Sequence, residues 1–276
     1  MKKIAVLYSG GTDSTCAVTL LLKKFDKVHL LTYKRFGLFC INNIEANVKK
    51  LKDKFGLDKF VYKVINVDKL FKHVSYAKYY YNLKKHGFFL LSTCGLCKLA
   101  MHIRTLIYCL ENSIEYVCDG ANKNAKYFPA QMPEVINEIK NMYARYGIVY
   151  LTPVFDFDEP KGTNWVDKLG LEKLQLKKIE KKGKNSIITS GKILFKMNFF
   201  PAENIKGTKI DHQMQARCFQ LILFNIFLYW YYLPKYGFLK YKETANSFYK
   251  EKIEYFNSLL KEYMEEKHGS KLYRFL

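Results

Sequence analysis

A short glycine-rich segment near the start of this 276-residue chain carries the clearest chemistry: Ser9–Ser14, with the sequence SGGTDS, directly follows an apolar run. Two adjacent glycines permit a tight turn in which no Cβ atom keeps a phosphate away from the backbone N–H groups. A helix predicted to start near Asp13 would direct its unpaired N–H groups and the positive end of its dipole at the same point. The segment therefore predicts a phosphate-binding loop.

The carboxylate of Asp13 opposes the binding of an anion unless it has a second task. It could hold a Mg²⁺ ion that the phosphates share, or cap the helix when the site is empty. The chain has neither a Gly-Lys-Thr string nor a G-x-G-x-x-G pattern at this turn. The alternative interpretation is an ordinary glycine-rich turn between a strand and a helix.

A second group of chemistry-bearing residues is Cys94-Gly95-Leu96-Cys97-Lys98. Thiols at the start of a helix and beside a lysine favour the thiolate, so either sulfur is a candidate nucleophile or metal ligand. A zinc site would need two further ligands at a similar spacing, and the chain has no second Cys-x-x-Cys. The alternative is that the spacing arises by chance in a chain with seven cysteines.

The SGGTDS segment is similar to the SGGxDS motif of the PP-loop ATP pyrophosphatase family, and the resemblance covers roughly residues 1–155. It implies ATP and Mg²⁺ as ligands and adenylation of a substrate oxygen with release of pyrophosphate. It also implies that Asp13 takes part in catalysis, that Thr32 and Tyr33 face adenine, and that Gly120 lies near the nucleotide. The residues that would hold pyrophosphate are Ser9, Gly10, Gly11, Thr12, Asp13 and Ser14.

The C-x-x-C-K element resembles one found in the sulfur-handling branches of that family, including tRNA thiolation enzymes. One branch implies a [4Fe-4S] cluster held by two such cysteines and a distant third. Another implies that one cysteine carries a persulfide that a second cysteine resolves. Cys94 and Cys97 are thus the catalytic and metal-ligand candidates.

The choice of a third cysteine rests on position along the chain. Cys218 follows a polar segment with His212 and Arg217 at the start of a very apolar stretch, and we select it as the third ligand. Cys40 and Cys118 remain alternatives, and simple burial of Cys218 does too. Cys16 is interpreted as a packing residue, and Cys109 lies too far along its predicted helix from Cys94 to share a metal.

Strand and helix patterns alternate along the first half of the chain, and these elements would position the residues named above. Such alternation predicts an α/β fold with a parallel sheet of about five strands and helices on both faces, HUP-like in the family that the loop resembles. Ligands of such sheets bind beyond the carboxyl ends of the strands. The expected strands are Ile4–Tyr8, Val28–Tyr33, Phe60–Val67, Ile114–Cys118 and Ile148–Val154; the expected helices are Ser14–Phe25, Asn42–Phe55, Thr93–Asn112 (preceded by Ser92 as a cap) and Pro133–Tyr146, with an aromatic connector over Tyr76–Leu91.

The chain changes character near residue 157, where we predict a boundary. Residues 1–157 would form the ATP-binding domain, and residues 158–276 a smaller, mainly helical domain that could bind substrate. Two long helices are expected over about 211–233 and 241–267. The uncharged run Cys218–Leu233 is shorter than the roughly 20 residues of a membrane span and favours a buried helix over an oligomer interface or membrane contact.

The net charge of +21 indicates attraction to polyanions, although a lysine-coated surface would give the same value. With the two motifs, it favours ATP-dependent sulfur transfer to a tRNA nucleobase. A small-molecule acceptor and a non-catalytic ATP sensor are the alternatives. An odd number of cysteines without a secreted disulfide pattern favours the cytoplasm. A sulfur-donor protein is an expected partner, and a homodimer is left open.

Overall fold

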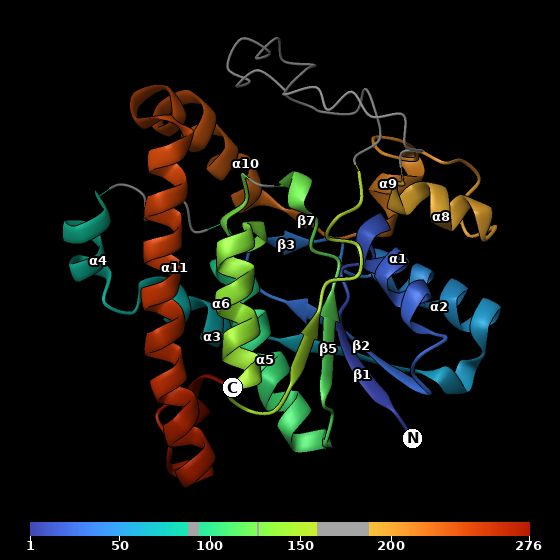
Figure 1. Ribbon diagram of the computed structural model, residues 1–276, viewed down its shortest axis with the longest axis horizontal. Helices are drawn as coiled ribbons and strands as arrows, with labels where there is room; N and C mark the ends of the chain where they lie inside the picture. Colours follow the sequence, from blue (N-terminus) through green and yellow to red (C-terminus); the bar gives the residue numbers. More distant parts are fainter. Residues whose placement is uncertain (88–93, 126, 159–187) are drawn as a thin grey trace.

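A computed structural model describes residues 1–87, 94–125, 127–158 and 188–276 of the chain. Its centre is a parallel sheet with the strand order β4-β2-β1-β5-β6 (Figure 1). This confirms the predicted fold class and all five predicted strands, with shifted ends. The strands are β1 (Lys3–Leu7), β2 (Lys27–Lys34), β4 (Phe60–Asn66), β5 (Tyr116–Asp119) and β6 (Val149–Leu151).

Both faces of the sheet are buried, as the apolar strands require. In β1, Ile4 and Val6 pack into one hydrophobic cluster, whereas Ala5 and Leu7 pack into the other, because successive side chains of a strand point to opposite faces. The first cluster lies under α1 (Thr12–Leu21), α2 (Asn43–Phe55) and α8 (Ser190–Lys196); the second lies under α3 (Asp68–Tyr76), α5 (Leu96–Asn112), α6 (Pro133–Ala144) and α11 (Leu233–Glu266).

The order of the strands creates a crevice at one edge of the sheet. The chain runs outward from β1 through β2 to β4 and then returns to place β5 on the other side of β1. Connections leave β1 and β5 in opposite directions, which is the arrangement at which open α/β sheets bind ligands. The Ser9–Ser14 loop follows β1 and Gly120 follows β5, so the two predicted segments meet at this crevice.

Three segments differ from the predicted elements. The expected helix over about 211–233 is wrong, because β7 (Arg217–Cys218) interrupts it and pairs antiparallel with β3 (Leu38–Phe39). Around that strand the chain forms α9 (Lys209–Met214), α10 (Phe219–Ile226) and a π-helical stretch, Phe227–Tyr232. The expected connector after Tyr76 instead contains α4 (Tyr79–His86), and Ser92 and Thr93 lie outside the described residues.

The uncharged run is only partly buried, contrary to the favoured interpretation. Phe224, Leu228 and Tyr232 are in the core, but an apolar stripe along the same helices is exposed and consists of Phe219, Ile222, Leu223, Ile226 and Trp230. Over the residues that the structure describes, no helix is both long and apolar enough to cross a membrane.

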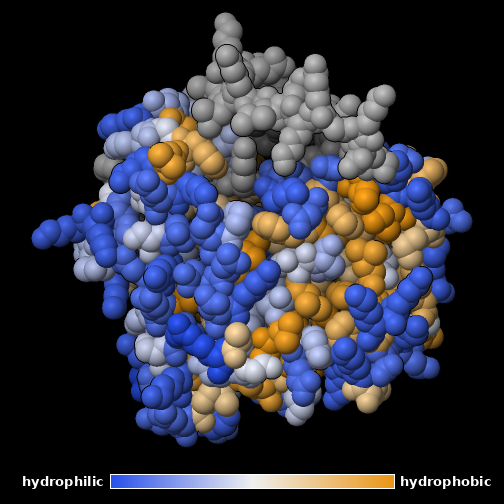
Figure 2. Space-filling model, viewed as in Figure 1, coloured by the Kyte–Doolittle hydropathy of each residue, from blue (hydrophilic) through white to orange (hydrophobic). Residues whose placement is uncertain are grey.

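The long helix α11 is broken at Gly237, where the backbone is not helical (φ +74°), and the part after the break is close to the expected helix. This part packs its inner face against the sheet. Phe248, Phe256 and Leu260 share one hydrophobic cluster with residues of the strands and of α5. Its outer side lies on a part of the surface that hydrophilic side chains cover (Figure 2). The domain boundary near residue 157 stays a prediction.

Candidate functional site

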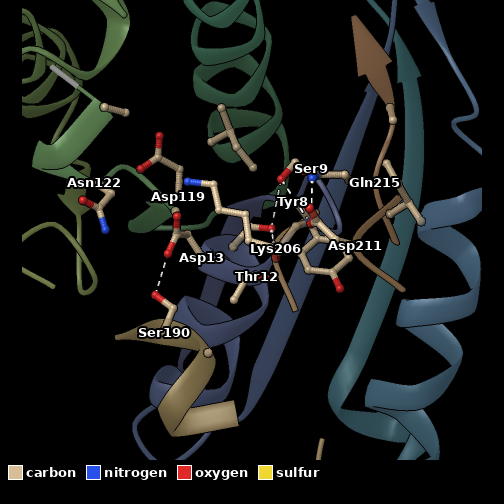
Figure 3. A pocket seen from close by; sticks show the side chains of 18 of the residues that line it. Tyr8, Ser9, Thr12, Asp13, Asp119, Asn122, Ser190, Lys206, Asp211 and Gln215 are labelled. Atoms are coloured by element: carbon tan, nitrogen blue, oxygen red, sulfur yellow. Dashed lines mark hydrogen bonds between the residues drawn. The ribbon is translucent and has the colours of Figure 1, made fainter. Parts of the chain in front are cut away.

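A cavity of about 500 Å³ opens at the carboxyl edge of the sheet, within the usual size range of small-ligand sites. In Figure 3, Asp119 and Asn122 lie on one side of it and Asp211 and Gln215 on the other, with Asp13 between them. The predicted residues that line the cavity are Ser9, Gly11, Thr12, Asp13, Ser14, Thr32, Tyr33 and Gly120. Sequence reasoning therefore placed these residues around one space.

The loop after β1 is held by its own hydroxyl groups. The hydroxyls of Ser9 and Ser14 are 3.0 Å apart, and Ser14 Oγ also donates to the carbonyl oxygen of Gly11 at 3.0 Å. Helix α1 starts at Thr12 without a side-chain cap, so its first N–H groups are available at the cavity. Such groups and the helix dipole suit an anion.

Two positions at the cavity require glycine, because the backbone of another segment comes too close to leave room for a Cβ atom. Gly10 has φ +76°, and a Cβ atom on it would lie 2.3 Å from the carbonyl oxygen of Met214. A Cβ atom on Gly120 would lie 2.5 Å from the backbone nitrogen of Ser14. Gly10 thus packs beneath the C-terminal segment rather than lining the cavity, and Gly120 lets β5 approach the start of α1.

Asn47 on α2 joins the loop to the C-terminal segment. Its buried Nδ2 donates to the carbonyl oxygen of Gly10 at 2.8 Å and lies 3.4 Å from that of Met214. No sequence pattern indicates this role, since an asparagine inside an amphipathic helix is ordinarily a surface residue.

The carboxylate of Asp13 is engaged by a residue from the other end of the chain. Ser190 Oγ donates to Asp13 Oδ1 at 2.5 Å. Ser190 is the first residue of α8, whose N-cap Thr189 accepts from the N–H of Lys192. Helix α8 therefore packs on α1 at the cavity. No motif near residue 190 predicts this contact from the sequence.

The predicted adenine-facing pair lies at the end of β2. Thr32 Oγ1 donates to the carbonyl oxygen of Tyr8 at 2.9 Å, which ties β2 to the loop. Tyr33 also lines the cavity, but its hydroxyl is 2.6 Å from Thr105 Oγ1 on α5, and burial raises its pKa. Tyr33 therefore presents its ring, and not a free hydroxyl, to this space.

A buried ion pair, which sequence reasoning did not select, lies beside Gly120. Lys98 Nζ is 2.6 Å from Asp119 Oδ2, and both residues line the cavity. Burial would raise the pKa of Asp119, but Lys98, His102 and the N–H of Ala121 together hold it below its usual value. His102 lies 3.8 Å from the same oxygen, and burial lowers its pKa to about 3. A carboxylate, a lysine and a neutral histidine thus meet at the end of β5.

The three selected cysteines gather around one arginine. Arg35 Nη2 donates to Cys218 Sγ at 3.1 Å, and the same guanidinium interacts with Cys97. Burial raises the pKa of Cys94 well above its usual value, and the nearby sulfurs of Cys97 and Cys218 add to this while Arg35 opposes it. The expected thiolate at Cys94 is therefore disfavoured by burial.

These cysteines border the cavity without being part of its wall, as far as the described residues show. Their neighbours Lys98, Leu38 and Ala216 do line it. Over the described ranges, no three His, Cys, Asp or Glu side chains are arranged as ligands of one metal ion. All seven cysteines are free thiols; Cys16, Cys109 and Cys118 are buried and Cys40 is exposed.

Comparisons with known proteins give little beyond the fold. No protein-family model matches the chain, and no curated protein does. Among solved structures, the chain is similar to the crystal structure of a predicted subunit of tRNA methyltransferase from Methanocaldococcus jannaschii. The two share 20% sequence identity over 79% of this chain and 97% of that chain, with a TM-score of 0.39. Similarity at this level says nothing about activity.

Proposed function

We propose that this chain uses ATP to adenylate a substrate oxygen, releases pyrophosphate, and then replaces the activated oxygen with sulfur. The observation that supports the first step most strongly is the convergence of the Ser9–Ser14 loop, the start of α1 and the Lys98–Asp119 pair on one cavity. An N–H-rich turn suits pyrophosphate, and a lysine suits the negative charge that develops when the α-phosphate is attacked.

Each group in the cavity has a proposed task. Backbone N–H groups of residues 11–14 would bind the departing pyrophosphate and hold it in line with the bond that breaks. Lys98 would contact the α-phosphate, and Asp119 holds the ammonium in place. Thr32 and the Tyr33 ring form the wall against which adenine packs.

Asp13 would hold the Mg²⁺ ion that the resemblance of the loop to the SGGxDS motif implies. The donor set fits, since a carboxylate and hydroxyl oxygens are ligands that Mg²⁺ prefers, and this ion usually needs only one or two carboxylates besides phosphates and water. Bound there, Mg²⁺ would neutralise phosphate charge. The Ser190 hydroxyl that now donates to Asp13 orients the carboxylate.

Among the described residues, no three His, Cys, Asp or Glu side chains are arranged around one metal ion, and the guanidinium of Arg35 interacts with both Cys97 and Cys218. The proposal therefore takes the persulfide alternative. The outer sulfur of a cysteine persulfide attacks the activated carbon, and AMP leaves with the oxygen. The thiol of a second cysteine then attacks the inner sulfur, so that the S–S bond to the substrate breaks, the thiolated product leaves, and the two cysteines form a disulfide that an external thiol reduces.

An RNA acceptor is favoured by the net charge of +21 and by the exposed surface from the end of α3 to α4. Tyr76, Tyr80 and Tyr81 are 59%, 85% and 56% exposed, and Lys78 and Lys84 lie in the same segment. Exposed aromatic rings among lysines are the usual means of binding unpaired bases and phosphates. Affinity for tRNA should fall with salt, with a log–log slope of about −0.7 to −0.9 per neutralised phosphate.

ATP–pyrophosphate exchange tests the proposal. Radioactive pyrophosphate should enter ATP when ATP, Mg²⁺ and total tRNA are present, and Lys98→Met should abolish this exchange. Exchange that requires a small heterocycle instead of RNA would favour the small-molecule alternative. ATP binding without exchange under any of these conditions would contradict the enzyme and leave an ATP sensor.

A further inference from the structure

The helices that follow β7 are apolar on two opposite sides. On one side, Phe224, Leu228 and Tyr232 lie in the hydrophobic core at intervals of four residues. The other side carries the exposed stripe, which consists of Phe219, Ile222, Leu223, Ile226 and Trp230. Their spacing places the five side chains on one helix face, and each is at least 52% exposed. Since a helix that is apolar all round is normally buried, the stripe indicates a surface that another molecule covers.

The exposed stripe continues onto the short ribbon of β3 and β7 at the carboxyl edge of the sheet (Figure 1). Helix α10 follows β7 directly, and the N–H of Phe219 donates to the carbonyl oxygen of Gly37 at 3.0 Å. Successive side chains of a strand point to opposite sides, so Phe39 and Leu38 face different ways. Phe39 is 46% exposed, whereas Leu38 lines the cavity. The stripe and Phe39 together form what we call the apolar face, and the inner side of the same ribbon is a wall of the cavity.

The apolar face is large enough to belong to a stable interface. A whole large side chain has a surface of roughly 200 Å², so these six side chains, each about half exposed or more, present on the order of 700 Å². The largest apolar patch of a typical monomer measures only about 300–600 Å². Each partner in a stable protein complex buries about 800 Å². The apolar face with a narrow polar rim would supply that area.

The distribution of charge favours a second copy of this chain as the molecule that covers the face. Two chains of net charge +21 repel each other unless they meet where charge is absent, and the run Cys218–Leu233 contains no Asp, Glu, Lys or Arg. RNA requires cations on the surface that it covers. A helix that lies on a membrane carries lysines or arginines beside its apolar side, which this run lacks. An identical, equally uncharged face on a second copy meets these conditions.

We propose that two copies of this chain associate through the apolar face about a two-fold axis, and that this association stabilises one wall of the cavity. Such an axis packs each face against its counterpart, so one self-complementary patch is sufficient. The interface does not depend on the proposed function, whereas its effect on ATP rests on that function.

The segment that precedes the apolar face connects it to the Ser9–Ser14 loop. The carbonyl oxygen of Met214 lies 3.4 Å from Asn47 Nδ2, which also donates to Gly10. Gln215 and Ala216 line the cavity, and a Cβ atom on Gly11 would lie 2.7 Å from Gln215 Oε1. A partner that covers the outer side of β3 and β7 would hold this segment against the loop. Association and ligand binding should therefore favour each other.

Sedimentation velocity of the full-length protein tests the interface without any ligand. The wild type should sediment with twice the mass of one chain and should dissociate on dilution, because association depends on the concentration of the chain. A monomer at every concentration would overturn the proposal. Flotation with vesicles of phosphatidylcholine and phosphatidylglycerol identifies the competing occupant: a wild type that stays monomeric and floats, while Ile226→Lys does not, would assign the apolar face to a membrane surface instead.

Two charge insertions locate the interface. In Ile226→Lys the new ammonium is solvated in the monomer but would be buried near its counterpart in the dimer, so association should weaken about a hundredfold or more. Leu57→Lys is the control: Leu57 is 67% exposed and precedes β4, at the other edge of the sheet, so this variant should stay dimeric. A dimer that persists in Ile226→Lys would overturn the apolar face as the interface. If circular dichroism shows that Ile226→Lys does not fold, Trp230→Ala replaces it, with an expected loss of about tenfold.

Calorimetry with a non-hydrolysable ATP analogue tests the coupling to the cavity. The monomeric Ile226→Lys should bind the analogue about fivefold more weakly than the wild-type dimer, and saturating analogue should in turn tighten the wild-type dimer. Equal affinity in the two proteins would overturn the coupling. Failure of both proteins to bind the analogue would refute the proposed function, while a dimer that Ile226→Lys disrupts would still support the interface.

Discussion

Ser190 donates a hydrogen bond to Asp13 across 177 residues of sequence, with 2.5 Å between Ser190 Oγ and Asp13 Oδ1. The contact joins the first turn of α1 to the first residue of α8. A carboxylate in an otherwise anion-binding turn is thereby given a fixed orientation before any ligand arrives. Such orientation is what a metal-holding carboxylate needs, since misplaced groups contribute little to catalysis.

Replacing Asp13 tests whether the charge or the hydrogen bond matters. Asp13→Asn keeps the size of the side chain but removes the negative charge that Mg²⁺ requires, so ATP–pyrophosphate exchange should fall about a hundredfold or more. Ser190→Ala removes only the orienting contact and should cost less than about tenfold. Full exchange in Asp13→Asn would exclude the carboxylate from the reaction.

Gly120 provides a steric test of the approach between β5 and α1. A Cβ atom at this position would lie 2.5 Å from the backbone nitrogen of Ser14, so Gly120→Ala must displace the start of the helix. We expect the affinity for a non-hydrolysable ATP analogue to fall about tenfold or more in calorimetry, since the helix start supplies the phosphate donors.

A matched control for Gly120→Ala exists in Gly269→Ala. Neither glycine has a left-handed φ, and a Cβ atom on Gly269 would meet no heavy atom closer than 3.8 Å. The control should bind the analogue as the wild type does. Equal affinity in the two variants would show that the helix start does not contact the phosphates.

Asn47 should matter for stability more than its place in a helix suggests. Asn47→Ala leaves the carbonyl oxygen of Gly10 without its 2.8 Å donor and is expected to lower the free energy of unfolding by about 1–3 kcal/mol in urea titrations. Asn43→Ala, on the same helix but exposed and 3.4 Å from its partner, should change it by less than about 0.5 kcal/mol. Equal effects would mean that the contact with the loop adds nothing.

Local chemistry explains what the sequence could predict. The Ser9–Ser14 loop is contiguous, and its glycines and hydroxyls shape a turn whose geometry depends on neighbours in the chain. Strand alternation then placed Gly120 across from that loop, because parallel strands end at one edge. The alternation of apolar strands and helices is also a local pattern, and the structure contains all five strands that it predicts.

Long-range partners explain what the sequence could not predict. Ser190, Asn47 and Arg35 take their roles from contacts with residues 37 to 183 positions away. Cys218 was expected to lie within a helix over about 211–233, but it pairs with Leu38 in a short strand. A two-residue ladder between distant segments has no periodic pattern by which the sequence could predict it. The exposed stripe beginning at Phe219 was missed for the same reason: apolar composition does not indicate which face is covered.

Buried histidine should make the fold sensitive to mild acid. Burial lowers the pKa of His102 to about 3, against an ordinary value of 6.5, even though Asp119 attracts a proton to it. Between these values the unfolded chain binds the proton and the folded chain does not, so stability is fully present above pH 6.5 and declines as the pH falls towards 3. For one such group the slope approaches about 1.4 kcal/mol per pH unit.

Urea unfolding of the wild type and His102→Gln from pH 5 to 7 measures this contribution. The variant should be less stable at pH 7, because it loses the contact between His102 Nδ1 and the Tyr143 hydroxyl at 3.1 Å, but its stability should depend less steeply on pH. His268→Gln, at an exposed position, controls for the loss of an imidazole. A slope in His102→Gln as steep as that of the wild type would show that the pKa of His102 is the same in the folded and the unfolded chain, and would contradict the prediction.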